Sequence, residues 1–136
     1  MSNWLNKSNT SSNVAQNLCA SKHYDVAIHC SYYSCVQLML HYLEFYFGLE
    51  QNEIDNMLNP KQNGGDGLHK ALGNYYYNSI DQKDEDDAFK FSNVLGKIRR
   101  HRITADYQKT ISNPDNFNNC DKWQSEITDI LNKHYD

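Results

Sequence analysis

The sequence is poor in the residues that most often interrupt helices. Its 136 residues include two prolines, Pro60 and Pro114, and six glycines, so long stretches hold no residue that ends or kinks a helix. Both prolines lie in asparagine-rich segments, 58–65 and 111–116. No segment alternates apolar and polar residues over a useful length, which argues against strands. The sequence therefore predicts an all-α protein in which the proline segments are loops.

The sequence also lacks an excess of positive charge, long apolar runs and paired cysteines. The 13 basic and 17 acidic side chains give a net charge of −4, which argues against a dedicated high-affinity DNA-binding protein. No run of about 18 uninterrupted apolar residues and no apolar leader occur, so we expect neither a membrane span nor a signal peptide. The four cysteines form no CxxC pair and match no zinc-ligand spacing. This favours a cytoplasmic protein with reduced thiols, no metal site and no cofactor.

The apolar pattern predicts one domain, residues 1–136, folded as an up-and-down bundle of four to five helices. The first two helices are expected over about 4–20 and about 24–49, and the third after Asp66 as N-cap. The fourth starts at the acidic segment 84–87 and contains the basic residues 97–102, and the last covers about 117–135. The first is expected to be interrupted at 8–13, and segment 53–58 to form only a short helical turn. The third is expected to carry Leu68, Leu72 and Tyr75 inward.

The helix predicted over about 24–49 is apolar most of the way round. Its apolar residues cover two adjacent faces: Ile28, Tyr32, Cys35, Met39, Tyr42 and Tyr46 on one, and Val36, Leu40, Leu43 and Phe47 on the other. A helix of this kind lies at the centre of a bundle or in a subunit interface. We expect both, and hence a homodimer.

An arginine falls on the apolar face of the fourth predicted helix. Apolar residues recur at Phe91, Leu95 and Ile98, and the next step of that stripe is Arg102. Asp106, four residues later, shares its face and can pair with it. The pair is interpreted as a structural ion pair or as a site at a helix junction or dimer interface. The base precedes the acid, which is the less favourable order, and burying the charges costs desolvation, so both observations favour a site.

Two further groups carry functional hypotheses next to that pair. Arg99, Arg100 and His101 are either a solvated helix face or a patch that contacts phosphate on RNA or a nucleotide. His69 is either a hydrogen-bonded structural residue or a general base. The ten tyrosines are explained equally well by base stacking and by a tyrosine-rich core or interface.

Three segments, in this order, resemble patterns of the HEPN superfamily of small α-helical domains. Segment 24–35, YDVAIHCSYYSC, has an aromatic residue, an alanine and then a Tyr-Tyr pair followed by small residues. Segment 67–70, GLHK, is similar to the His-Lys-bearing start of a later helix. Segment 102–107, RITADY, resembles the Arg-x-x-Ala-Asp-Tyr signature of one HEPN branch. With the helix order, the resemblance covers about residues 14–132.

The resemblance implies a bundle of four to five helices that commonly dimerises. Members are often metal-independent ribonucleases, or partners of nucleotidyltransferases in toxin–antitoxin and phage-defence systems. Ribonuclease members carry an arginine followed after four to six residues by a histidine, and two such sites meet at the dimer interface. Arg102 matches the arginine, but no histidine lies in the window after Arg102, Arg99 or Arg100. After Arg102, this window holds Tyr107 and Gln108 instead of a histidine.

We therefore expect a non-catalytic, dimeric HEPN-like module that binds RNA, a nucleotide or a protein partner such as a nucleotidyltransferase. The binding residues expected for it are Arg99, Arg100, His101, Arg102 and Tyr107. The alternative is a divergent metal-independent endoribonuclease that uses Arg102 as the cation for the phosphorane, with Asp106 and either His69 or His101. A third hypothesis is a purely structural protein in which Arg102 and Asp106 form a buried tie.

Overall fold

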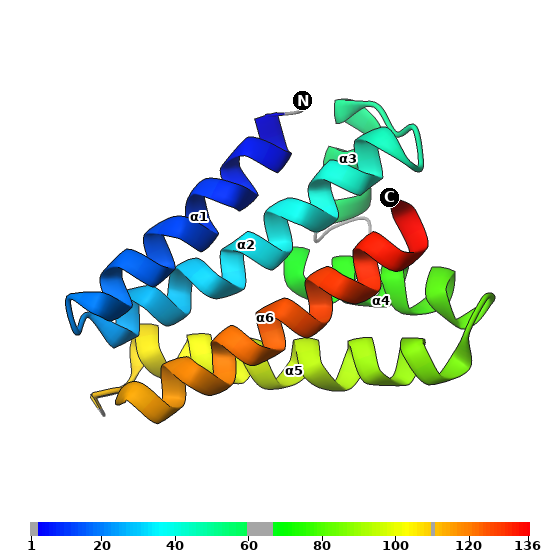
Figure 1. Ribbon diagram of the computed structural model, residues 1–136. Helices are drawn as coiled ribbons and strands as arrows, with labels where there is room; N and C mark the ends of the chain where they lie inside the picture. The colour runs from blue at the N-terminus through cyan, green and yellow to red at the C-terminus, as the bar shows by residue number, and fades with distance from the viewer. Residues whose placement is uncertain (1–2, 60–66, 110) are drawn as a thin grey trace.

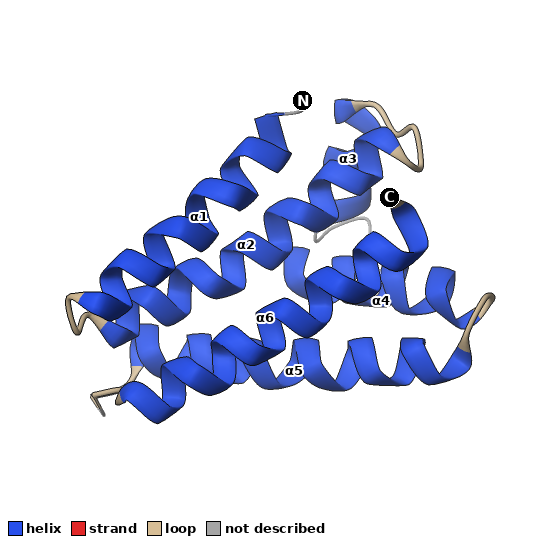
Figure 2. Cartoon of the chain, in the orientation of Figure 1, coloured by secondary structure: helices blue, strands red, loops and turns tan. Residues whose placement is uncertain are grey.

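The computed structural model describes residues 3–59, 67–109 and 111–136, which form helices and no strand (Figure 2). The helices are α1 (Asn3–Ala20), α2 (Tyr24–Phe45), α3 (Gln51–Leu58), α4 (Leu68–Asp81), α5 (Glu85–Tyr107) and α6 (Pro114–Tyr135). The prediction of an all-α protein is confirmed. The described residues contain one helix more than the largest number expected, because the segment predicted as a short turn forms the eight-residue helix α3.

Helix α2 is the central element of the bundle. It packs against α1, α5 and α6, and Figure 1 shows α1 with α2 and α5 with α6 as two antiparallel pairs. Helix α4 lies alongside α5. The apolar residues around α2 are thus covered from several sides, which confirms its predicted central position. Its second predicted role, in a subunit interface, stays a prediction.

The first helix is continuous, so the expected interruption at 8–13 is wrong. Two polar residues of that segment, Ser8 and Ser11, have polar partners on α2. The hydroxyl of Ser8 donates to the backbone oxygen of Ser34 at 2.7 Å, and Ser11 Oγ lies 2.7 Å from the Gln37 amide. Because these hydroxyls bond across to α2, they do not compete with the backbone hydrogen bonds of α1.

Several helix ends differ from the prediction for reasons that lie in the local backbone. Helix α2 ends at Phe45 instead of Leu49, and the chain turns at Gly48, whose φ of 68° lies in the left-handed region. Helix α6 begins at Pro114, three residues before the expected start, because Asn113 and Asn116 form a reciprocal capping box. The N-cap of α4 is Gly67, so the expected N-cap Asp66, which lies outside the described residues, is wrong by one position.

The N-terminal end of α5 agrees with the acidic start that the sequence indicated. Asp84 is the N-cap, and its carboxylate accepts a hydrogen bond from the backbone of Asp87 at 3.0 Å. On α4, Leu72 is buried as expected, and Leu68 and Tyr75 are partly buried and pack against the core. Tyr76, which was not among the expected inward residues, is fully buried. The Tyr76 hydroxyl donates to the backbone oxygen of Met39, and this bond accounts for its place in the core.

The core contains two of the four cysteines. Cys35 and Cys120 are buried, Cys19 and Cys30 are partly buried, and all four are free thiols. In the described ranges, no helix combines the length and the apolar character that crossing a bilayer requires.

Candidate functional site

Arg102 is buried at the contact between α5 and α2. The apolar stripe of α5 that faces the core continues through it, and only 6% of the residue is exposed. Its guanidinium carbon lies 5.3 Å from the ring centroid of Tyr32 and 5.7 Å from that of Tyr33, both on α2. These distances suit cation–π attraction, so two aromatic rings of α2 hold the arginine on the inner face of α5.

Asp106 connects this arginine to a histidine of α2. Arg102 Nη1 donates to Asp106 Oδ2 at 3.3 Å, so the pairing expected from their spacing is present. The same oxygen lies 2.9 Å from Nδ1 of His29. The exposed fraction of the side chain rises from 8% for Arg102 to 19% for Asp106 and 41% for His29. These three residues, the Arg102–Asp106–His29 chain, join the buried end of the site to the surface.

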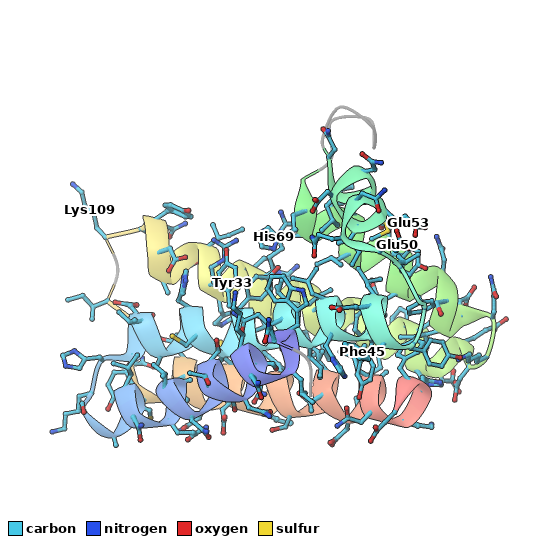
Figure 3. The ribbon with its side chains drawn as sticks, turned by 90° about the horizontal axis from the view of Figure 1, so that it is seen from above. Tyr33, Phe45, Glu50, Glu53, His69 and Lys109 are labelled. Atoms are coloured by element: carbon cyan, nitrogen blue, oxygen red, sulfur yellow. The ribbon has the colours of Figure 1, made fainter. Side chains whose placement is uncertain are left out.

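His69 lies on the other side of the same pair of tyrosines. Its Nδ1 is 2.6 Å from the hydroxyl of Tyr32, and Figure 3 shows it close to Tyr33, whose ring centroid is 6.0 Å away. Burial raises the pKa of the Tyr32 hydroxyl well above its ordinary value. Burial, followed by repulsion from Arg102 and Arg99, lowers the pKa of His69 to about 4.

These pKa shifts fix the protonation of the Tyr32–His69 pair at neutral pH. Tyr32 keeps its proton and His69 is uncharged, so either group can donate in their hydrogen bond. We assign the phenol as the donor to Nδ1, because it is the stronger acid and the imidazole nitrogen is the stronger base. The ring hydrogen of His69 is then on Nε2. His69 is therefore a fixed hydrogen-bond donor and a weak base.

A cavity of about 350 Å³ lies between α4 and α5 next to His69. Arg99 contributes the cationic group of α5 to its lining, and none of the described residues that line it is acidic. The Nε atoms of Arg99 and Arg102 are buried, and neither has a hydrogen-bond partner in the part of the chain that the structure describes. A buried donor without an acceptor is costly. Because the two Nε atoms expose almost no surface, a ligand in the cavity can meet Arg99 only through the part of its side chain that lines the cavity.

The basic residues expected to form one binding surface are divided between two sides of α5. Arg100 is exposed and, with His101, lines a separate hollow of about 210 Å³ next to the start of α6. The His101 ring packs on Trp123 at 4.9 Å, and its Nδ1 lies 3.1 Å from the backbone oxygen of Lys97. Tyr107 is 76% exposed at the end of α5. The structure thus brings Arg99, Arg102, Asp106 and His69 together and places Arg100 and His101 elsewhere.

Sequence reasoning missed His29. The histidines considered were His69, His101 and any histidine four to six residues after an arginine, whereas His29 precedes Asp106 by 77 residues. The residue lies inside the segment 24–35 that carries the family resemblance. That position is the one feature of the sequence that could have pointed to His29. Its role in the site depends on the packing of α2 against α5.

No protein-family model, no curated protein and no solved structure matches the chain. The likeness to the HEPN superfamily therefore rests on the three sequence segments. Within 3–59, 67–109 and 111–136, no three His, Cys, Asp or Glu side chains are placed to hold a metal ion.

Proposed function

We propose that the chain is a non-catalytic, dimeric HEPN-like module that binds RNA or a nucleotide through the α4–α5–α2 surface around Arg99 and Arg102. By the family resemblance, it would act in a toxin–antitoxin or phage-defence type system, with a nucleotidyltransferase as the class of protein partner. The observation that carries the proposal is Arg99, which lines the cavity between α4 and α5 and forms no ion pair with any described residue.

The charge balance of this surface supports an anionic ligand. Asp106 neutralises Arg102 in part, while Arg99 forms no ion pair within the described ranges. The neighbouring His69 is held neutral, so it adds a donor without adding charge. Guanidinium groups bind phosphate through several directed hydrogen bonds, which makes a phosphate ester the best match.

The test is RNA binding measured by fluorescence anisotropy with a short labelled single-stranded RNA. We expect Arg99→Gln to weaken binding about tenfold or more, since it removes a charge-assisted contact. Lys90→Gln is the control: it removes one positive charge from an exposed position of the same helix that does not line the cavity, so the affinity of this variant should stay near that of the wild type. Binding should also weaken with salt. Equal losses in both variants, or no binding by the wild type, would contradict the proposal.

A second candidate function, a metal-independent ribonuclease, is favoured by the hydrogen bond between His29 and Asp106. A carboxylate on Nδ1 orients an imidazole and leaves Nε2 free to accept a proton. In this reaction the 2′-oxygen attacks phosphorus, the bond to the 5′-oxygen breaks, and His29 takes the 2′-hydroxyl proton. Water supplies the proton of the leaving oxygen.

The two candidates are separated by a cleavage assay on mixed single-stranded RNA in excess EDTA. The non-catalytic module predicts no cleavage by the wild type. The ribonuclease predicts cleavage that is lost in His29→Gln and in Arg102→Ala and kept in His23→Gln, which changes an exposed histidine just before α2. Activity that survives the first two substitutions would rule out this site as its source.

A further inference from the structure

Helix α1 is held on α2 with little buried apolar surface. Of its 18 residues, two are buried, Ser8 and Ala15, whereas α6, which packs on the same α2, has six. Four more apolar residues of α1 are partly buried against the core: Trp4, Leu5, Leu18 and Cys19. Its contact with α2 includes a reciprocal polar pair, in which Ser8 and Ser34 each donate to the backbone oxygen of the other, at 2.7 and 3.0 Å. Because burial of apolar surface is the main force that holds helices together, α1 is the more easily released of the two.

The turn that joins α1 to α2 is short and strained. It consists of residues 21–23, and Lys22 has a φ of 63°, in the left-handed region. The amides of Lys22 and His23 donate to the backbone oxygens of Cys19 and Leu18, at 2.9 and 2.8 Å. This is the Schellman pattern, in which glycine usually takes the position of Lys22 because a side chain destabilises the left-handed conformation. The turn contains neither glycine nor proline, so it can also adopt helical angles and join α1 and α2 into one helix.

Two chains opened in this way are complementary to each other. Helices α1 and α2 are antiparallel in the closed chain (Figure 1). Two continuous helices over 3–45 that lie antiparallel therefore place α1 of each chain on α2 of the other. The contacts between α1 and α2 are then reproduced between the chains, including the Ser8–Ser34 pair. Such an exchange relieves the strain at Lys22 in both copies and keeps the contacts of the closed chain.

Exposed apolar side chains lie next to this turn. Val26 and Ile111, which are 54% and 83% exposed, line a hollow together with Lys22 and His23. Figure 1 shows the turn at the same end of the bundle as the connection between α5 and α6. In the exchanged pair, the two bodies approach each other at their turns, so Val26 and Ile111 of one copy face the second copy. Burial of these side chains adds a contact that the closed monomer lacks.

We propose that two copies of this chain form a dimer by exchanging α1, with residues 21–23 as the hinge. The partner is a second copy because it offers Ser8 and Ser11 of the released helix the same acceptors, Ser34 and Gln37, that they have in the closed chain. The inference rests on the dimer of the proposed function and specifies how that dimer is built.

The first test is a disulfide that records whether the α1 and α2 in contact belong to one chain. Ser8 Oγ and Ser34 Oγ lie 3.2 Å apart, so Ser8→Cys combined with Ser34→Cys places two thiols within bonding reach. Diamide oxidises them: the two thiols lose two protons and two electrons to form the S–S bond, and diamide is reduced to the hydrazine. Light scattering first gives the native mass of the double variant. Denaturing electrophoresis without reductant then gives the mass of the linked product.

Each result decides the proposal. A native dimer that denatures to two linked chains supports the exchange. A native dimer that denatures to single chains with an internal disulfide overturns the exchange and leaves an unexchanged dimer standing. A native monomer overturns the exchange and the proposed dimer together. The single variants Ser8→Cys and Ser34→Cys are the matched controls for the four native cysteines, and both should denature to single chains.

Two hinge variants test the exchange without a disulfide. Glycine adopts a positive φ without strain and disfavours a continuous helix, so Lys22→Gly stabilises the closed chain at both hinges of the dimer. We expect its dimer Kd, measured by sedimentation equilibrium, to be about tenfold or more above that of the wild type. Lys22→Ala is the matched control: it removes the same side chain, keeps the strain of the closed turn and favours the helix. Its Kd should equal the wild-type value or lie below it. Equal Kd values for the glycine and alanine variants would overturn the exchange.

Discussion

At the scale of single residues, Arg99 and Arg102 show how position on one helix changes the chemistry of the same side chain. Arg102 faces α2, where a carboxylate and two tyrosine rings surround it. Arg99 lines the α4–α5 cavity and has no described carboxylate partner. The first is therefore largely satisfied inside the protein, and the second is the cation available to a ligand. The positive charges of both arginines help to lower the pKa of His69.

His69 should make the stability of the protein depend on pH in a defined window. Its pKa is lowered from 6.5 to about 4 in the folded state. Between these two values the unfolded chain binds the proton more readily, so stability falls as pH decreases from about 6.5 and the loss is complete below about 4. We expect the decrease in Tm from pH 7 to pH 5 to be smaller for His69→Gln than for the wild type, measured by circular dichroism.

The control for this prediction is His23→Gln, which replaces an exposed histidine and should keep the wild-type dependence on pH. If the Tm of His69→Gln and of the wild type decreases by the same amount from pH 7 to pH 5, His69 does not resist protonation in the folded protein. The hydrogen-bond roles derived for its two ring nitrogens would then be wrong.

At the scale of elements, the Arg102–Asp106–His29 chain ties the C-terminal end of α5 to α2. A similar tie occurs at the opposite end of α5, where Asp87 accepts from Lys133 and His134 of α6. Those two partners hold the pKa of Asp87 below its usual range. Charged side chains thus bind both ends of α5 to its neighbours, while apolar residues fill its middle.

Removing one member of the Arg102–Asp106 pair should lower the free energy of unfolding more than removing both. Asp106→Leu leaves the buried guanidinium of Arg102 without its partly exposed carboxylate, and we expect the free energy of unfolding to fall by about 2 kcal/mol. Arg102→Met combined with Asp106→Leu removes both charges and should recover most of that loss. Urea denaturation of the wild type, both single variants and the double variant gives the coupling energy. If the losses in the free energy of unfolding are additive in this cycle, the two side chains do not stabilise the protein as a pair.

At the scale of the whole molecule, apolar side chains are exposed where the start of α2 meets the end of α5. Val26 is 54% exposed and Ile111 83% exposed, and both line a hollow of about 290 Å³. Val26 also borders the hollow next to His29 and Asp106. Exposed apolar groups gathered around a polar site favour this end of the molecule as the surface of the proposed homodimer.

We expect the wild type to be a dimer and the double variant Val26→Asp with Ile111→Asp to be a monomer, since two carboxylates at an apolar contact are strongly unfavourable. Size-exclusion chromatography with light scattering measures the mass directly. Phe45→Asp is the control: Phe45 is 61% exposed and lies at the other end of α2, far from Lys109 at the end of α5 (Figure 3). A monomeric wild type, or dissociation by the control alone, would refute this surface.

Much of the fold could be predicted from the sequence, since the information is local. The period of the apolar residues identified the long helices, and Asp84 marked the start of α5. The placement of Arg102 among the buried residues also follows from that period, because a helix fixes which residues share a face. Helix ends were less certain, as those near Gly48 and Asn113 depend on single backbone conformations and reciprocal caps.

The site could be predicted only in part. An all-helical chain and the pairing of Arg102 with Asp106 on one helical face follow from the order of the residues. The packing of the helices is needed to bring His29 to Asp106 and His69 to Tyr32, and to place Arg99 and Arg100 at different hollows. The physical reason is that helical periodicity orders residues along one element. The crossing of α2, α4 and α5 in space sets which groups from different elements come within hydrogen-bond distance.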